Sequence, residues 1–393
     1  MSLSFSMTRS IPVAKPETRT FYPALDGLRA LAFLMVFFQH YMRVPWGWSG
    51  VDFFFVLSGF LITGILFDTR NESHRFRNFY LRRTLRIFPL YYGIMLLLVL
   101  TYPVLHWRWS WPWLVWPAYV GNFARFVHPY LDGSPLQRLA DFQPVGSLRG
   151  LHLPLALGHF WSLCVEEQFY LIWPCVVFVV RDRVKLSWIC ALSLPVCLGM
   201  RLAGQHFLPT WMLDKEVLYR ATPFRFDALL IGGLIALMMR GPRADFMRRV
   251  SRIVFPIAAL LALVGVVVIP GGHIFRDPYP YPDWSFTFGL SGLDVLAALL
   301  ILVAIQPGSL VCRILSRAPL RWIGRISYGA YVLHDIPHSI FNWIGAHVAP
   351  AYSAELSALL ALVFTLLFAW LSFRYFERWF LGLKERLTAR ETT

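Results

Sequence analysis

The stretch LSALLALVFTLLFAWLSF, residues 356–373, decides the fold class because it contains no charged residue. A second uncharged stretch, IVFPIAALLALVGVVVIPGGH, covers residues 253–273. An α-helix of roughly 20 predominantly apolar residues crosses the hydrocarbon core of a bilayer. A helix that is apolar on every side needs either lipid or a large protein core around it. Two such stretches in one chain predict a membrane protein.

The whole chain has the composition of a membrane protein. Of its 393 residues, 57% are hydrophobic and 15% are charged, whereas soluble domains carry about 25% charged residues. Apolar runs along the chain predict an all-α, polytopic integral membrane protein of about ten transmembrane helices. We expect a segment 1–24, a membrane domain 25–380 and a tail 381–393, with helices near residues 25–42, 50–67, 87–104, 159–180, 186–203, 224–239, 253–270, 286–305, 326–345 and 354–373.

The distribution of positive charge predicts the orientation in the membrane. If the N-terminus is inside, the inside connections carry 26 of the 37 lysines and arginines, and the outside connections carry 9. Cytoplasmic loops are enriched in these residues, so both termini are expected in the cytoplasm. This bias accounts for the net charge of +15 without a nucleic-acid partner. The five cysteines are scattered and form no CxxC pair, so neither a disulfide framework nor a metal site is expected.

The first two predicted helices carry ionisable residues, which are costly inside a membrane and mark functional sites. Arg29 and His40 are 11 positions apart, close to three helical turns, so they share one face about 16 Å apart along the axis. Asp52 begins the second helix, at the same end as His40. A carboxylate on one imidazole nitrogen leaves the other free as a base. Each residue also has a purely structural interpretation. His40 would be an ordinary interfacial histidine, Arg29 would extend its side chain to the inner surface, and Asp52 would cap the N-terminus of its own helix.

Positive charge also gathers at the inner end of the third predicted helix, as Arg82, Arg83 and Arg86. Arg83 and Arg86 share one helix face at i, i+3. Guanidinium groups suit phosphate recognition, so these residues and Arg29 are candidates for binding a phosphorylated ligand. Ordinary positive-inside charge is the competing interpretation.

The fourth predicted helix contains two adjacent carboxylates, Glu166 and Glu167, roughly 10 Å below its outer end. They are further candidates for orienting or replacing a histidine base. Because Arg225 and Asp227 are two positions apart and do not face each other on a helix, their partners are expected on other helices. The remaining polar candidates inside predicted helices are Ser162, Arg225, Asp227, Asp294, Ser327, Tyr328 and His334.

Five motifs, in chain order, resemble those of the membrane acyltransferase-3 family. They are LDGLRA with Arg29 and His40, GVDFFFVLSGFLI at residues 50–62, the pair Arg83 and Arg86, WSLCVEEQ at residues 161–168, and SYGAYVLH at residues 327–334. The resemblance runs from about residue 21 to residue 380. One departure is Trp379, where that family pattern would have proline.

The resemblance implies ten spans in the cell inner (cytoplasmic) membrane, an acyl-CoA donor and acyl transfer to hydroxyls, usually of envelope carbohydrates. Acetyl-CoA is the expected co-substrate, and no permanently bound cofactor is expected. The resemblance also implies that Arg29 and His40 are required and that Arg83 and Arg86 contribute. Some members carry a fused extracytoplasmic domain, which we do not expect here; the acceptor would be handled directly or by a separate extracytoplasmic protein.

The residues and the resemblance together predict a mechanism. His40 is the expected general base, with Asp52 or a glutamate of the fourth helix to orient it, and the arginines are expected to hold the nucleotide end of CoA. A proton-coupled transporter is the main alternative, because intramembrane His, Arg and Glu also build proton relays, although the inverted repeat typical of transporters is not evident. The second alternative is a non-catalytic membrane scaffold.

Overall fold

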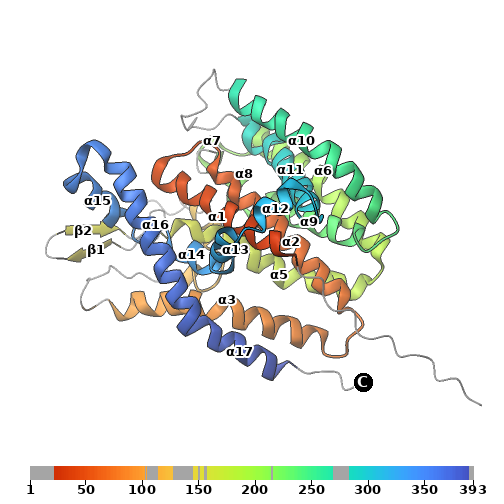
Figure 1. Ribbon diagram of the computed structural model, residues 1–393, viewed down its shortest axis with the longest axis horizontal. Coiled ribbons are helices and arrows are strands. Elements are labelled where there is room, and N and C mark those ends of the chain that lie inside the picture. The colour runs from red at the N-terminus through yellow and green to blue at the C-terminus, as the bar shows by residue number, and fades with distance from the viewer. Residues whose placement is uncertain are drawn as a thin grey trace, which may run out of the picture.

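The computed structural model describes residues 22–101, 103, 114–126, 145–148, 151–154, 157–213, 216–268 and 283–388, and its regular structure is almost entirely helical. The longer helices, shown in Figure 1, are α1 (Pro23–Met42), α2 (Gly50–Asp68), α3 (Arg75–Leu100), α5 (Trp161–Val180), α6 (Arg183–Phe207), α9 (Phe226–Met238), α10 (Ala244–Val268), α11 (Phe288–Ala304), α15 (His338–Val348), α16 (Ser353–Leu371) and α17 (Arg378–Leu387). The shorter ones are α7 (Thr210–Leu213), α8 (Val217–Arg220), α12 (Leu310–Leu315), α13 (Ala318–Arg325) and α14 (Ser327–Leu333), and a π-helical turn at Ser372–Glu377 joins α16 to α17.

The surface of this helical assembly is the kind that lipid covers. Five described helical segments are long and apolar enough to cross a membrane: Gly47–Asp68, Arg75–Leu100, Gly158–Val180, Arg183–Phe207 and Pro350–Leu383. Large apolar side chains on the outer helices are widely exposed, as at Val179 and Phe207, which are both 79% exposed. Soluble proteins rarely expose contiguous apolar surface. The chain is therefore a multi-pass membrane protein; the count of ten spans and the cytoplasmic termini stay predictions.

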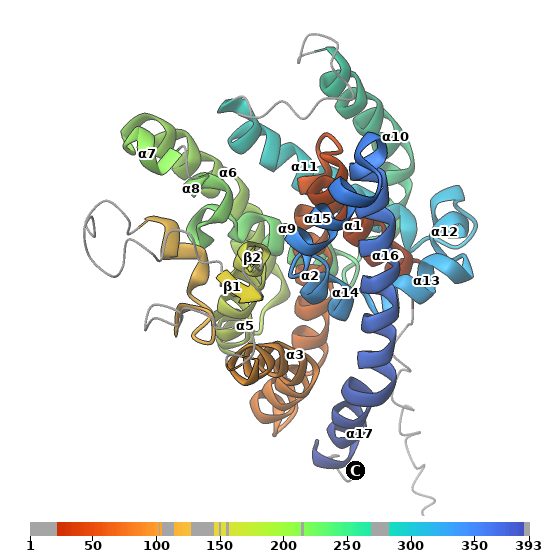
Figure 2. The same ribbon diagram turned by 90° about the vertical axis from the view of Figure 1, so that its left-hand side faces the viewer.

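The centre of the assembly is formed by α1 and α2, which lie between α6 and α9 on one side and α14 and α16 on the other (Figures 1 and 2). Two glycines allow α2 and α9 to cross in backbone contact. A Cβ atom on Gly59 would lie 1.7 Å from the Leu229 carbonyl oxygen, and one on Gly232 would lie 1.9 Å from the Val56 carbonyl oxygen. Small residues at helix crossings let backbones approach closely in membranes, where packing drives association.

One predicted helix, residues 326–345, is wrong as a single element. It divides into α14 and α15, which are separated by residues 334–337. Proline has no backbone N–H and disfavours helical conformation in the residue before it, so Pro337 explains why α14 ends ahead of it. The Tyr41 hydroxyl donates a hydrogen bond of 2.8 Å to the His334 carbonyl, which satisfies one backbone group freed by the break.

Other differences from the sequence analysis lie at the edges of the molecule. An antiparallel hairpin of β1 (Val145–Leu148) and β2 (Leu151–Pro154), with Val145 opposite Pro154, was not anticipated by the all-α prediction. The predicted segment 1–24 lies almost wholly outside the described residues. The predicted tail, 381–393, begins within α17 and is described only to residue 388.

Candidate active site

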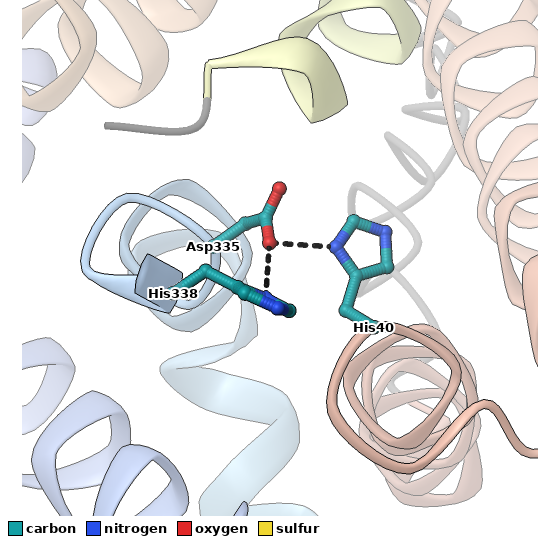
Figure 3. A group of neighbouring side chains, drawn as sticks. All are labelled: His40, Asp335 and His338. Atoms are coloured by element: carbon teal, nitrogen blue, oxygen red, sulfur yellow. Dashed lines mark hydrogen bonds and ion pairs between the residues drawn. The ribbon is translucent and has the colours of Figure 1, made fainter. Parts of the chain in front are cut away.

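The helix break brings a carboxylate to the histidine at the end of α1 (Figure 3). His40 Nδ1 lies 2.9 Å from Asp335 Oδ1. His338, in the first turn of α15, places its own Nδ1 3.1 Å from the same oxygen. Asp335 is buried, and the His40 side chain retains 27% of its exposure. The three residues form a cluster joining α1 to the α14–α15 break.

The hydrogen bonds of this cluster fix which nitrogen of His40 carries the proton. An ionised carboxylate only accepts hydrogen bonds, so the proton between His40 and Asp335 belongs to Nδ1. In neutral His40 the Nε2 atom is then an unprotonated base. This is the arrangement in which a carboxylate fixes the imidazole tautomer and stabilises the imidazolium once a proton is taken up.

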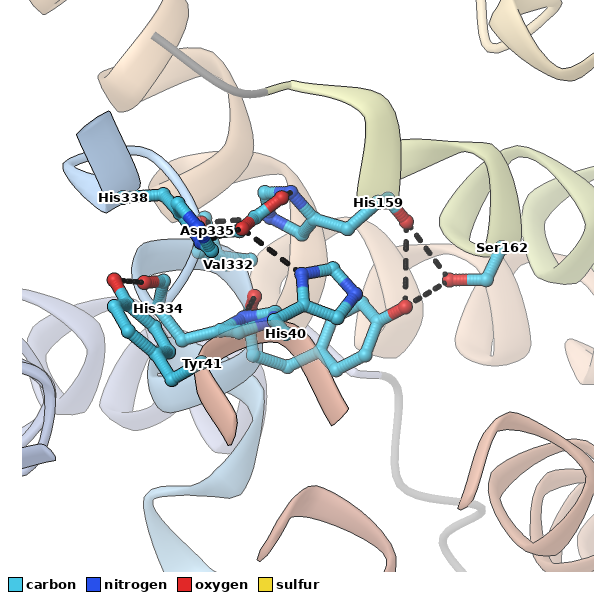
Figure 4. A network of polar contacts seen from close by, with 9 residues as sticks. His40, Tyr41, His159, Ser162, Val332, His334, Asp335 and His338 are labelled. Carbon is cyan, nitrogen blue, oxygen red and sulfur yellow. Dashed lines mark hydrogen bonds and ion pairs between the residues drawn. The ribbon is translucent and has the colours of Figure 1, made fainter. Parts of the chain in front are cut away.

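Two further histidines surround the cluster (Figure 4). His159 Nδ1 lies 3.5 Å from Asp335 Oδ2, and His159 Nε2 lies 3.2 Å from the Val332 carbonyl oxygen. The fully buried His334 donates from Nδ1 to the Tyr331 carbonyl over 2.7 Å, while its Nε2 has no hydrogen-bond partner among the described residues. Asp335 thus has imidazole nitrogens on both of its oxygens.

His40 and Asp335 line a cavity of about 300 Å³, which we call the histidine cavity. Its walls come from α1, α2, α8, the start of α5 and the α14–α15 break, and they combine aromatic rings with polar groups. The aromatic lining is Trp48, Trp161, Tyr219, Phe286 and Tyr331, and the other polar or charged lining residues are Gln39, His159, Glu216 and Arg220. Arg220 Nη2 is paired with Glu216 at 2.6 Å.

A second cavity, of about 220 Å³, is lined by three of the four arginines predicted to bind a phosphorylated ligand, and we call it the arginine cavity. Arg29, Arg83 and Arg86 all line it, and Arg86 is exposed. Glu166 and Glu167 line it as well, so two carboxylates face the same space as three guanidinium groups. The cavity therefore has charged walls where anionic and cationic groups of a ligand would both find partners.

The expectation that Asp52, Glu166 or Glu167 orients His40 is wrong, because Asp335 occupies that place. Asp52 Oδ1 instead accepts a hydrogen bond of 2.5 Å from Arg225, and both residues are buried. Equal depth on neighbouring helices did not imply contact, because the two side chains leave their helices in different directions.

Arg225, which immediately precedes α9, and Asp227, on α9, do have partners on other helices, as expected. Arg225 reaches α2, and Asp227 accepts a hydrogen bond of 2.7 Å from Arg201 on α6. Arg201 also donates to Ser291 over 2.6 Å. Asp294, on α11, is fully buried beside this group.

Comparison with known proteins identifies the family to which this geometry belongs. A family model described as an acyltransferase domain matches residues 22–374. The chain belongs to the acyltransferase-3 family. No solved structure matches it at a significant level.

Relatives within the acyltransferase-3 family include longer proteins. The chain is 30% identical to the peptidoglycan O-acetyltransferase OatA of Listeria monocytogenes over 92% of this chain and 56% of that protein. It is 26% identical to the O-acetyltransferase OatA of Staphylococcus aureus over 91% of this chain and 57% of that protein. The chain therefore spans a little over half the length of these relatives.

Of the remaining predicted residues of this acyltransferase-3 chain, three line the arginine cavity and two do not. Ser162, Ser327 and Tyr328 line the cavity, and the Tyr328 hydroxyl donates to the Ile87 carbonyl over 2.6 Å. Arg82 is not among the lining residues, and His334 lies beside His40, with ring centroids 5.0 Å apart.

Sequence reasoning missed Asp335, His338 and His159. The signal for the first two was the HDIPH run at residues 334–338, which places an acid and a proline inside a predicted span. His159 was visible only as the first residue of the fourth predicted helix.

The histidine cluster also has the composition of a metal site. Ligand atoms of His40, Asp335 and His338 all lie within 4.8 Å of one another, and imidazole with carboxylate is a ligand set that zinc accepts. The hydrogen bonds of both imidazoles to one carboxylate account for the grouping by themselves.

Proposed function

We propose that the protein is an O-acetyltransferase that takes an acetyl group from acetyl-CoA at the cytoplasmic face of the inner membrane and transfers it to a hydroxyl of an envelope carbohydrate. The observation that supports this proposal most is the adjacency of the two cavities, which share Val51 and Tyr331 as lining residues. One cavity presents His40 as a base, and the other presents arginines suited to phosphate groups.

The arginine cavity is the proposed donor site. Arg83 and Arg86 stand at the inner end of a predicted span, where cytoplasmic CoA would arrive, and the exposure of Arg86 gives the cavity an opening at the surface. Their guanidinium groups would pair with the CoA phosphates. The pantetheine arm would then extend past Arg29 toward His40, which lies about 16 Å further along α1.

The histidine cavity is the proposed acceptor site. Aromatic rings such as Trp48, Trp161 and Tyr219 line it, and rings of this kind offer apolar faces beside polar handles. Sugars present apolar C–H faces together with hydroxyls, so they match such a lining. Because the relatives are named as O-acetyltransferases, one of them acting on peptidoglycan, peptidoglycan glycan is the first acceptor to test. We include a separate extracytoplasmic protein in the proposal as the partner that presents the acceptor or passes on the acetyl group.

His40 supplies the base in the proposed reaction. Its Nε2 takes the proton of the acceptor hydroxyl, and Asp335 holds the ring and stabilises the imidazolium. The experiment is acetyl transfer from labelled acetyl-CoA to peptidoglycan fragments by purified protein in vesicles. We expect transfer by the parent protein and by His206→Gln, which changes an exposed histidine outside both cavities, and loss of transfer by His40→Gln.

The outcomes separate the proposal from its alternatives. Labelled acetyl groups that stay on CoA in the presence of every carbohydrate acceptor tried would overturn the proposed activity. Transport of protons or of a solute across the membrane of the same vesicles, with no acetyl transfer, would instead support a transporter. Equal transfer by His40→Gln and His206→Gln would remove His40 as the base.

A further inference from the structure

The two cavities meet at one polar side chain. Their shared lining residues are Val51 and Tyr331, of which only Tyr331 carries a hydroxyl. Tyr331 is buried and lies on α14, four residues before Asp335. The carbonyl carbon under attack must be reached by CoA from one cavity and by the acceptor from the other. The reacting carbonyl is therefore expected beside Tyr331.

The Tyr331 hydroxyl belongs to a triangle of contacts. It lies 2.6 Å from Ser162 Oγ and 3.2 Å from the His159 carbonyl oxygen, and Ser162 Oγ lies 3.1 Å from that same carbonyl. The two hydroxyls supply two protons for three contacts. The His159 carbonyl also accepts from the backbone N–H of Trp161. Ser162 can therefore donate to the Tyr331 oxygen, and the Tyr331 proton is free to turn toward a bound ligand without leaving a buried carbonyl unpaired.

We propose that the Tyr331 hydroxyl is the oxyanion donor of the acyl transfer, with Ser162 as its positioning residue. The inference rests on the proposed function, since it assumes an acyl thioester at the junction of the cavities. Tetrahedral intermediates of acyl transfer carry a negative oxygen, and a hydrogen-bond donor aimed at it lowers the barrier. Ser162 donates to the tyrosine oxygen over 2.6 Å, which holds the Tyr331 hydroxyl in place and polarises its O–H bond.

The proposed acyl transfer passes through a tetrahedral intermediate. The acceptor oxygen bonds to the acetyl carbonyl carbon while its proton passes to His40 Nε2, and the carbonyl oxygen becomes the oxyanion held by Tyr331. The oxyanion then re-forms the carbonyl, the C–S bond breaks, and its electron pair leaves on the CoA sulfur. The thiolate takes a proton from water, and His40 releases its own.

The test compares Tyr331→Phe with Tyr92→Phe in the vesicle assay. Both variants keep the ring and lose a hydroxyl, but Tyr92 donates to the Pro117 carbonyl over 2.9 Å and lines neither cavity. Removing one oxyanion donor typically costs about 10²- to 10³-fold in kcat. We expect that loss for Tyr331→Phe, with the KM for acetyl-CoA within about threefold of the parent value. Ser162→Ala should lose less, since Tyr331 can still donate.

Each outcome has a separate meaning. An active parent with an equally active Tyr331→Phe would overturn the oxyanion role and leave the proposed function standing, because acetyl transfer itself would still take place. An inactive parent would overturn both. If Tyr331→Phe loses activity together with thermal stability, or with a KM increase that accounts for the whole loss, Tyr331 is a structural or binding residue and the inference is wrong.

Discussion

Replacement of Asp335 by asparagine tests the central geometry of the site. The substitution keeps the shape of the side chain but removes the negative charge that accepts from His40 at 2.9 Å and from His338 at 3.1 Å. A hydrogen bond to a charged group contributes about 1.5–3 kcal/mol. Each 1.4 kcal/mol changes an equilibrium constant about tenfold, and we apply the same factor to a rate. We therefore expect kcat to fall about 10- to 150-fold.

The fall should appear in kcat and not in the KM for acetyl-CoA, because Arg29, Arg83 and Arg86 line a different cavity. The assay is the initial rate of acetyl transfer in vesicles over a range of acetyl-CoA concentrations. Asp68→Asn is the matched control, since Asp68 pairs with Arg240 at 2.6 Å on the opposite end of α2 and its side chain is 42% exposed.

A folded Asp335→Asn protein with a kcat within twofold of that of Asp68→Asn would refute the assignment of Asp335 as the residue that orients His40. The melting temperature of each variant must accompany the rate, because Asp335 is buried and its neutralisation also affects the packing of the α14–α15 break. A loss of activity that tracks the loss of folded protein would likewise count against a positioning role.

Further predictions concern the base, the donor site, the helix crossing and the topology. His40→Ala should insert normally but lose about 10²- to 10⁴-fold in the rate of acetyl transfer, measured on protein of confirmed fold. Arg83→Ala combined with Arg86→Ala should raise the KM for acetyl-CoA more than the KM for the acceptor. An unchanged KM for acetyl-CoA in an active double variant would mean that both residues are ordinary positive charge on the inner side of the membrane. Gly232→Ala should lower the free energy of unfolding by about 1–3 kcal/mol, seen as a lower melting temperature, because its Cβ would lie 1.9 Å from a carbonyl oxygen. Reporter fusions at the C-terminus and within residues 271–285 should report opposite sides of the membrane.

The sequence by itself determined the features that depend on local chain geometry. Helices formed at the predicted apolar runs because a backbone in lipid must satisfy its own hydrogen bonds. The separation of Arg29 and His40 placed both toward the same side of α1, since 11 residues are close to three turns. Each residue now lines one of two adjoining cavities. The pair Arg83 and Arg86 could be assigned to one helix face in the same way.

The tertiary structure decided which of these residues meet. Tyr41 bonds to the carbonyl of His334, 293 positions later, and the neighbouring pair, His40 and Asp335, meets at the same place. Asp52 was at a suitable depth for His40, but the backbone crossing of α2 and α9 places it against Arg225. Helical periodicity fixes the direction of a side chain only relative to its own axis. Which neighbour fills that direction depends on how the helices cross and where Pro337 interrupts one of them, and both are set by long-range packing.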